Sequence, residues 1–91
     1  MLARIEPSPV VELNRAVALA FASGPDAGLA LLGPLLAEPA MDRYQPLHAA
    51  HAELLRRKHD RAGALRAYGR AIDLSINAVE RAELERRRAA L

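Results

Sequence analysis

The fold is decided by an internal repeat, in which NRAVALAFASGPDAGLALLGPLLA (residues 14–37) aligns with HAAHAELLRRKHDRAGALRAYGRA (residues 48–71) at an offset of 34 positions. Small residues coincide at this offset, because Ala18 falls on Ala52 and Ala30 falls on Ala64. We expect the two helices of each hairpin to cross at these alanines, since a bulky side chain would force the backbones apart. The other coincidences are Leu13 with Leu47, Phe21 with Leu55, Asp26 with Asp60, Leu31 with Leu65, and Ala37 with Ala71.

A spacing of 34 residues is the period of tetratricopeptide repeats, which are helix–turn–helix units that stack on their neighbours. The alternative is that an alanine-rich pair of amphipathic hairpins aligns with itself by chance. Alanines, large apolar residues and turn acids all coincide at one offset, which favours the repeat. We therefore predict an all-α fold, a tetratricopeptide-like right-handed stack of helical hairpins with about five helices. In this stack Phe21, Leu55 and Tyr68 fill the space between helices, and Ala37 and Ala71 lie where one hairpin meets the next helix.

Caps and helix breakers divide the chain into the predicted elements. Ser8 is a good N-cap with proline after it, and Gly24-Pro25 ends the first helix. Asp26, Asp60 and Asn77 are expected to cap the second, fourth and fifth helices, and Glu80 completes a capping box with Asn77. The third helix begins within residues 42–45 and ends near residue 58, after a linker at 38–41. The predicted single domain covers residues 1–91, with a first hairpin at 8–37, a second hairpin at 42–75 and a capping helix at 77–91.

Pro34 is the misfit of the repeat, because it falls on Tyr68 at the 34-residue offset. A proline inside a helix removes the hydrogen bond to the carbonyl four residues earlier, here that of Ala30, and clashes with the preceding turn. We therefore expect the second helix to kink or end near Gly33–Pro34.

Composition narrows the class of protein. Apolar residues make up 52% of the 91 residues but aromatic residues only 3%, so leucine, alanine, valine and isoleucine must build the core. The absence of cysteine from the sequence excludes disulfides, thiol chemistry and cysteine-ligated zinc. No apolar run in the sequence is long enough to cross a bilayer, and the N-terminus lacks a signal-peptide pattern, so we predict a cytoplasmic protein that does not act at a membrane.

Two basic runs, Arg56-Arg57-Lys58 and Arg86-Arg87-Arg88, raise the question of nucleic-acid binding. The net charge is only +2, from 13 basic and 11 acidic residues, and the acids are interspersed. Glu53 can pair with Arg57 and Glu83 with Arg87 one helical turn away, and few aromatic residues are present for base stacking. We therefore expect a solvated face of mixed charge and no direct DNA contact.

No catalytic or metal-binding constellation is recognisable. His48 and His51 lie three residues apart on one helix and His59 follows, but no cysteine or well-placed acid completes a zinc ligand set. The Gly24–Gly28 turn lacks the Lys-Ser/Thr ending of a phosphate loop. Serines occur only at expected helix ends. We expect no enzyme activity, no catalytic residues, no metal and no cofactor.

Longer segments carry a resemblance to a known family. The most specific is Pro7-Ser8-Pro9-Val10-Val11-Glu12-Leu13-Asn14-Arg15-Ala16-Val17-Ala18; others are residues 24–29, 47–57, 67–74, 77–81 and 86–91. Over essentially the whole chain, the sequence resembles the tetratricopeptide-like C-terminal domain of bacterial extracytoplasmic-function (ECF) RNA polymerase sigma factors. It differs from that pattern at Gln45-Pro46, where His-Leu is expected, and at Pro34.

The resemblance implies a non-catalytic domain that controls transcription initiation through protein contacts. The implied partners are the RNA polymerase core, the sigma factor's own promoter-reading domains or a separate regulator. Neither promoter-reading domain is found within the 91 residues, so we expect one domain of a longer protein, which as a fragment could form a homodimer. A free-standing tetratricopeptide-like adaptor and a basic helical nucleic-acid-binding module are the alternatives.

In tetratricopeptide repeats the first helix of each hairpin lines the concave face, and its exposed positions meet the partner. The 34-residue register places on this face Glu12, Arg15, Leu19 and Ala22 from the first hairpin, then Pro46, Ala49, Glu53 and Arg56 from the second. Glu12, Arg15, Leu19, Glu53 and Arg56 are the predicted partner-binding residues. Their mixture of charges and apolar groups suits a polar peptide or a helix.

Overall fold

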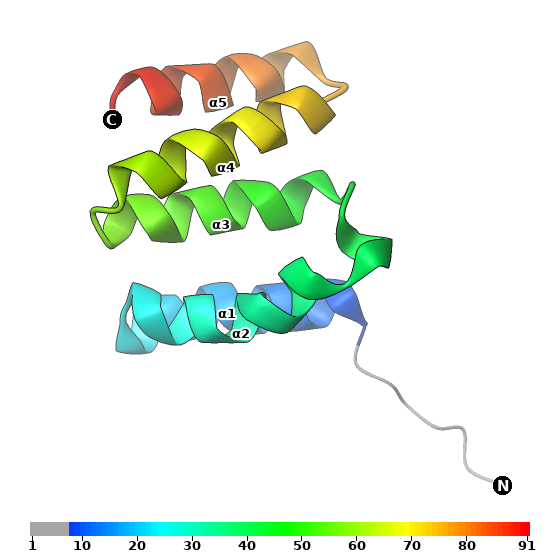
Figure 1. Ribbon diagram of the computed structural model, residues 1–91, viewed down its shortest axis with the longest axis vertical. Coiled ribbons are helices and arrows are strands. Elements are labelled where there is room, and N and C mark those ends of the chain that lie inside the picture. Colours follow the sequence, from blue (N-terminus) through cyan, green and yellow to red (C-terminus); the bar gives the residue numbers. More distant parts are fainter. Residues whose placement is uncertain (1–7) are drawn as a thin grey trace, which may run out of the picture.

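The computed structural model describes residues 8–91, which form a stack of helices (Figure 1). The α-helices are α1 (Pro9–Ser23), α2 (Pro25–Ala37), α3 (Gln45–Arg57), α4 (Arg61–Leu74) and α5 (Ala78–Ala89), and a single 3-10 turn, Pro39–Met41, joins α2 to α3. Within the described range there is no strand. The predicted all-α class, with five α-helices, is confirmed.

The helices pack as two antiparallel hairpins followed by a covering helix. α1 packs along α2, α3 packs along α4, and α5 lies on α4 at the far end of the stack (Figure 1). The two hairpins meet chiefly between α2 and α3, with a smaller contact between α1 and α3. α3 is therefore the helix that joins the two halves.

Most of the predicted helix ends are confirmed, because capping depends on local sequence. The side chain of Ser8 accepts a hydrogen bond from the Val11 amide, and that of Asp60 accepts one from the Gly63 amide. Asn77 accepts from two amides in the first turn of α5. The prediction for Asp26 is wrong: the cap of α2 is Gly24, and Asp26 lies one residue inside the first turn.

The core consists of two clusters of buried side chains, and α3 contributes to both. The first cluster contains Leu13, Ala16, Ala20, Leu32, Met41, Leu47 and Leu54. The second contains Ala52, Ala64, Ala67, Tyr68, Ala71 and Leu84. Four alanines make the second cluster thin, and Tyr68 is its one large, fully buried side chain.

The structural repeat has a spacing of 36 residues, two more than the sequence alignment predicted. The N-cap of α1 is Ser8 and that of α3 is Tyr44, and the caps of α2 and α4, Gly24 and Asp60, lie the same distance apart. At this spacing buried residues coincide, in the pairs Ala16 with Ala52, Gly28 with Ala64, and Leu32 with Tyr68. The two registers differ because alanines recur so often that they align at several offsets, whereas the helix starts, Pro9 with Gln45 and Pro25 with Arg61, fix the spacing at 36 residues.

The predicted crossing of the first hairpin is consequently wrong. Ala18 and Ala30 are both exposed, whereas Ala52 and Ala64, the predicted pair in the second hairpin, are both fully buried. The close approach of α1 and α2 occurs at Gly28 instead. A Cβ atom at Gly28 would lie 2.6 Å from the carbonyl oxygen of Ala16 and 2.7 Å from the Cβ of Ala20.

Other packing predictions divide between the two hairpins in the same way. Tyr68 and Ala71 are fully buried and Leu55 is half-buried, as expected of packed residues. Phe21 is 68% exposed and Ala37 is also exposed, so neither fills the space predicted for it. These exposed side chains belong to the first hairpin, which packs against other helices on one side only.

α2 does not end at Gly33–Pro34 but continues to Ala37 with Pro34 inside it. The physical reason is the position of the proline on the helix. Both Pro34 and Ala30 are exposed, so the Ala30 carbonyl that loses its helical partner faces solvent instead of the core. In the observed 36-residue register Pro34 corresponds to Arg70 and not to the buried Tyr68, so Pro34 no longer stands at a core position.

Among residues 8–91, no helix combines the length and the hydrophobicity needed to pass through a lipid bilayer.

Candidate protein-binding groove

The side of the stack formed by α1, α3 and α5 carries three adjoining hollows, of about 240, 320 and 390 Å³. The first and second share Glu53 and Arg87, and the second and third share Arg56 and Ala90, so together they form one continuous surface. We call this surface the arginine groove; it is lined by Val17, Phe21, Ala49, Ala50, Glu53, Leu54, Arg56, Arg57, His59, Arg61, Arg87, Ala90 and Leu91.

Glu53 is the centre of a polar cluster in the middle of the groove. Its carboxylate accepts two hydrogen bonds from Arg56, at 2.6 and 3.1 Å, and lies 3.5 Å from the Arg57 guanidinium. Arg87 of α5 approaches the same carboxylate at 3.8 Å. The hydrogen bond from Arg56 is the main reason why the pKa of Glu53 lies below its usual value. Glu53 is therefore an ionised carboxylate with guanidiniums from two helices around it.

Tyr68 connects this surface cluster to the core. Its ring is fully buried in the second core cluster, and its hydroxyl donates a hydrogen bond of 3.1 Å to Glu53. Burial, together with the negative charge of Glu53, raises the pKa of Tyr68, so the phenol stays protonated and remains a donor. The packed ring thereby holds the carboxylate of Glu53 in one orientation at the floor of the groove.

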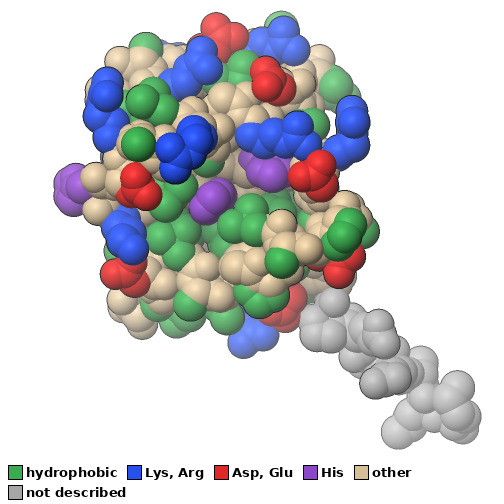
Figure 2. Space-filling view, viewed as in Figure 1, with side chains coloured by type: hydrophobic (Ala, Val, Ile, Leu, Met, Phe, Trp, Pro, Cys, Tyr) green, Lys and Arg blue, Asp and Glu red, His purple; other side chains and the backbone are tan. Residues whose placement is uncertain are grey.

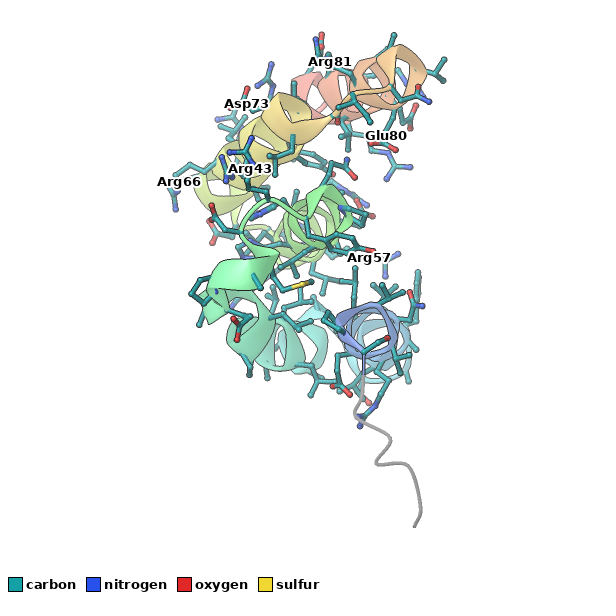
Figure 3. All side chains as sticks on the ribbon, turned by 90° about the vertical axis from the view of Figure 1, so that its right-hand side faces the viewer. Arg43, Arg57, Arg66, Asp73, Glu80 and Arg81 are labelled. Carbon is teal, nitrogen blue, oxygen red and sulfur yellow. The ribbon has the colours of Figure 1, made fainter. Side chains whose placement is uncertain are left out.

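An exposed aromatic ring forms one end of the groove. The Arg57 guanidinium lies 4.2 Å from the centre of the Phe21 ring, within the range of a cation–π contact. Figure 3 shows Arg57 on the side of the stack where α1 lies, far from Arg66 on the opposite side. Val17, one helical turn before Phe21, and Ala49 and Ala50 of α3 make this end of the groove apolar.

The structure divides the five predicted partner-binding residues between two places. Glu53 and Arg56 line the groove. Glu12 and Arg15 instead form a local ion pair of 3.1 Å on α1. Leu19, half-buried, is two residues before Phe21, and successive helical residues are about 100° apart, so the two side chains leave α1 on opposite sides. The predicted roles of these residues in binding remain predictions.

Alignment at 34 residues missed Val17, Phe21 and Arg57. The observed 36-residue register pairs Val17 with Glu53 and Phe21 with Arg57, both of which lie in the groove. The signal that would have found them is the equal spacing of the helix starts, not the coincidence of alanines. Of the remaining predicted face, Ala49 lines the groove, and Ala22 and Pro46 are exposed.

The two basic runs are partly neutralised by neighbouring acids. The predicted one-turn pairs are both present, Arg57 with Glu53 at 3.5 Å and Arg87 with Glu83 at 2.9 Å. Arg86 also pairs with Glu83. Lys58 reaches Asp26 of α2 at 2.9 Å, an exposed pair between the two hairpins in which Asp26 raises the pKa of Lys58. These pairs lower the positive potential that a nucleic-acid backbone would meet.

The two neighbouring histidines lie on the other side of the stack. His48 and His51 line a hollow of about 410 Å³ between α2, α3 and α4, beside Asp60 and Arg66. Figure 2 shows histidine side chains near the middle of this face, with Lys and Arg side chains beside them. The ring of His48 donates to the Asp42 carbonyl oxygen at 2.7 Å.

Burial is the main cause that lowers the pKa of His51, which favours a neutral imidazole. In the part of the chain that the structure describes, no three His, Asp or Glu side chains gather to hold a metal ion.

In comparisons with known proteins, the chain matches one part of a longer protein. An uncharacterized protein of Rhizobium meliloti (strain 1021) is 42% identical over 81 residues, which is 89% of this chain but 19% of that protein. The chain thus spans about a fifth of the length of the curated relative it matches. No protein-family model and no solved structure matches.

Proposed function

We propose that this chain is a non-catalytic protein-interaction domain at the C-terminus of an ECF-type RNA polymerase sigma factor. It controls transcription initiation by contacting the polymerase core, the promoter-reading domains or a regulator. The observation that carries the interaction role is the arginine groove, where exposed Phe21 lies beside Arg57 and Arg87. Phenylalanine and arginine are enriched in protein interfaces. An exposed aromatic side chain contributes to binding when a partner covers it.

The sigma-factor context comes from the sequence resemblance, above all from the segment Pro7–Ala18. The length of the R. meliloti relative supports it, because a match to a fifth of that protein is expected for one domain of several. A domain of this kind acts through its surface, and in the groove apolar and charged side chains converge on one continuous hollow surface.

A nucleic-acid-binding module is the weaker candidate. Four arginines line the groove, but Glu53 lies among them and is held ionised by Arg56. A phosphate backbone would meet this negative charge in the middle of its path. Phe21 and His59, at opposite ends, are the two aromatic rings in the groove lining, too few and too far apart for stacking successive bases.

Two measurements test the proposal. The first is the sequence of the gene upstream of the codon for Met1, which must encode promoter-reading domains. The second is transcription from a target promoter by the complete protein carrying Arg57→Glu, compared with Arg66→Glu as a control of equal charge change on the opposite side of the stack (Figure 3).

We expect Arg57→Glu to reduce transcription and Arg66→Glu to leave it unchanged. Circular dichroism must show that both variants are folded. Normal transcription and normal polymerase binding by a folded Arg57→Glu protein would exclude the groove as the working surface. An upstream region without promoter-reading domains would instead indicate a free-standing adaptor.

A further inference from the structure

We propose, building on the function above, that the arginine groove binds an acidic segment of a partner protein that also carries an aliphatic side chain. The aliphatic side chain lies at the Phe21 end, and the carboxylates lie along the arginines toward α4. The inference depends on three features of the groove: its continuity, its apolar end and its excess of arginine.

The apolar end can hold a leucine-sized or isoleucine-sized group. Val17 and Phe21 of α1 and Ala49 and Ala50 of α3 line this end, and the hollow measures about 240 Å³. Phe21 is 68% exposed, although only three aromatic residues occur in the chain. Covering this ring with an apolar side chain would remove it from water, which is the main source of affinity at such sites.

The excess of arginine over acidic residues in the groove favours a partner that carries carboxylates. Arg56, Arg57, Arg61 and Arg87 line the groove, whereas Glu53 is its single acid. Glu53 pairs with Arg56 at 2.6 Å and lies 3.5 Å from Arg57 and 3.8 Å from Arg87. Arg87 also pairs with Glu83, beside the groove, at 2.9 Å. A guanidinium has five N–H donors, so the two carboxylates of Glu53 and Glu83 cannot occupy the donors of four arginines. Carboxylates of a partner would complete these pairs bidentately.

The fixed position of Glu53 gives the groove directionality. Because Tyr68 and Arg56 hold this carboxylate in place, acidic side chains of a partner are repelled from the centre and directed to the arginines on either side. A segment with acidic residues on both sides of a neutral one satisfies this pattern. Continuous polyanions such as nucleic acids do not, since they carry a charge at every repeat.

The test is selection of a random dodecapeptide library displayed on phage against the 91-residue chain. Counter-selection uses the Phe21→Ser, Arg57→Gln double variant, so that only peptides needing the groove are retained. We expect the enriched peptides to contain Asp or Glu together with Leu, Ile or Val. Enrichment of neutral or basic peptides, or no enrichment, would overturn the inference.

The affinity of an enriched peptide is then measured by fluorescence anisotropy for single variants. Arg57→Gln is expected to weaken binding about tenfold, as the loss of a charged hydrogen bond does, and Arg66→Gln to leave it unchanged. Equal weakening by both variants would indicate non-specific charge attraction and overturn the site. A twelve-nucleotide single strand of thymidines serves as the competing probe, and its tighter binding would overturn the choice of a peptide.

The outcomes separate this inference from the proposed function. If the selected peptides bind the groove but Arg57→Glu leaves transcription and polymerase binding intact, the groove is not the working surface in transcription and the peptide site stands. If Arg57→Glu lowers transcription but the selection enriches no acidic peptide, the interaction surface stands and the acidic partner is wrong.

Discussion

The helices of the two hairpins of this chain pack against each other through different side chains. At the observed spacing, Gly28 of the first hairpin corresponds to Ala64 of the second, and Leu32 corresponds to Tyr68. In the first hairpin the helices meet through a glycine and a purely apolar core. In the second they meet through alanines, and the buried tyrosine reaches a surface carboxylate.

This difference follows from what each hairpin has beside it. The second hairpin is covered by α5, which brings Leu84 into its core and Arg87 to Glu53. The first hairpin ends the stack, and it carries exposed Val10, Val11 and Phe21. Repeat stacks place their polar surfaces on terminal, capping elements, and here α5 has that character. The polar anchor of Tyr68 and Glu53 thus lies in the hairpin that α5 covers, whereas exposed Phe21 lies on the hairpin without such a cover. Apolar exposure is not confined to the open end, because Ile76 and Val79 are exposed around the start of α5.

The largest expected effect tests the core side chains that correspond in the two hairpins. Tyr68→Ala should destabilise the fold by about 3–5 kcal/mol and Leu32→Ala by about 2–5 kcal/mol, because both leave a cavity in place of a fully buried side chain. Tyr68→Phe, which keeps the ring and removes only the hydrogen bond to Glu53, should cost about 0.5–1.5 kcal/mol. Urea unfolding gives all three values. A Tyr68→Phe loss as large as that of Tyr68→Ala would show that the polar anchor, not the ring, stabilises the second hairpin.

The second effect tests the glycine crossing of the first hairpin. Gly28→Ala should destabilise by about 1–3 kcal/mol, since its Cβ would overlap Ala16 and Ala20 of α1. Gly69→Ala inside α4 meets only the Arg88 guanidinium, at 3.9 Å from the new Cβ, so it should stabilise by about 0.5–1 kcal/mol through helix propensity. Thermal unfolding of both variants separates crowding from propensity. If Gly28→Ala also stabilises, the two helices do not approach as closely as this crossing requires.

The third effect tests the two alanines that the sequence alignment had equated. Ala52→Leu should destabilise by about 1–3 kcal/mol, because Ala52 is fully buried between α3 and α4. Ala18→Leu should change stability by less than about 0.5 kcal/mol, because Ala18 is exposed. Equal losses in chemical denaturation would restore the 34-residue register and contradict the observed one.

The helix boundaries could be predicted from sequence because their signals are local. Ser8, Asp60 and Asn77 cap helices in the way their side chains dictate, whatever lies around them. Asp26 did not, because Gly24 with its φ of 96° already starts α2 two residues earlier. A glycine in this conformation can end one helix and begin the next without any side-chain cap.

The register and the groove could not be predicted in the same way. An alanine carries little information about which side of a helix it occupies, so the alignment selected Ala18 where packing selected Ala16. The error rotated the predicted surface of α1 away from Phe21, which the same alignment had matched with Leu55 and placed between helices. Glu53 and Arg56 line the groove although the 34-residue register chose them, because α3 has neighbours on both sides, which leaves few positions for charged side chains.

The smallest expected effect tests the turns of the two hairpins. The first hairpin turns at Gly24, with a φ of 96°, whereas the second turns at His59, the non-glycine residue among residues 8–91 with a positive φ, 66°. A residue with a Cβ atom in this left-handed region lowers the stability by about 1–2 kcal/mol relative to glycine. Replacing it with glycine recovers only part of this, because glycine also has greater conformational freedom in the unfolded chain. His59→Gly should therefore stabilise the fold by about 0.5–1 kcal/mol, and the matched Gly24→Ala should destabilise it by about 1–2 kcal/mol. Both are measured by thermal and urea unfolding in the same buffer. If His59→Gly destabilises the fold, the imidazole must contribute more to stability than the backbone strain at residue 59 costs. The second turn would then depend on a side chain, unlike the first.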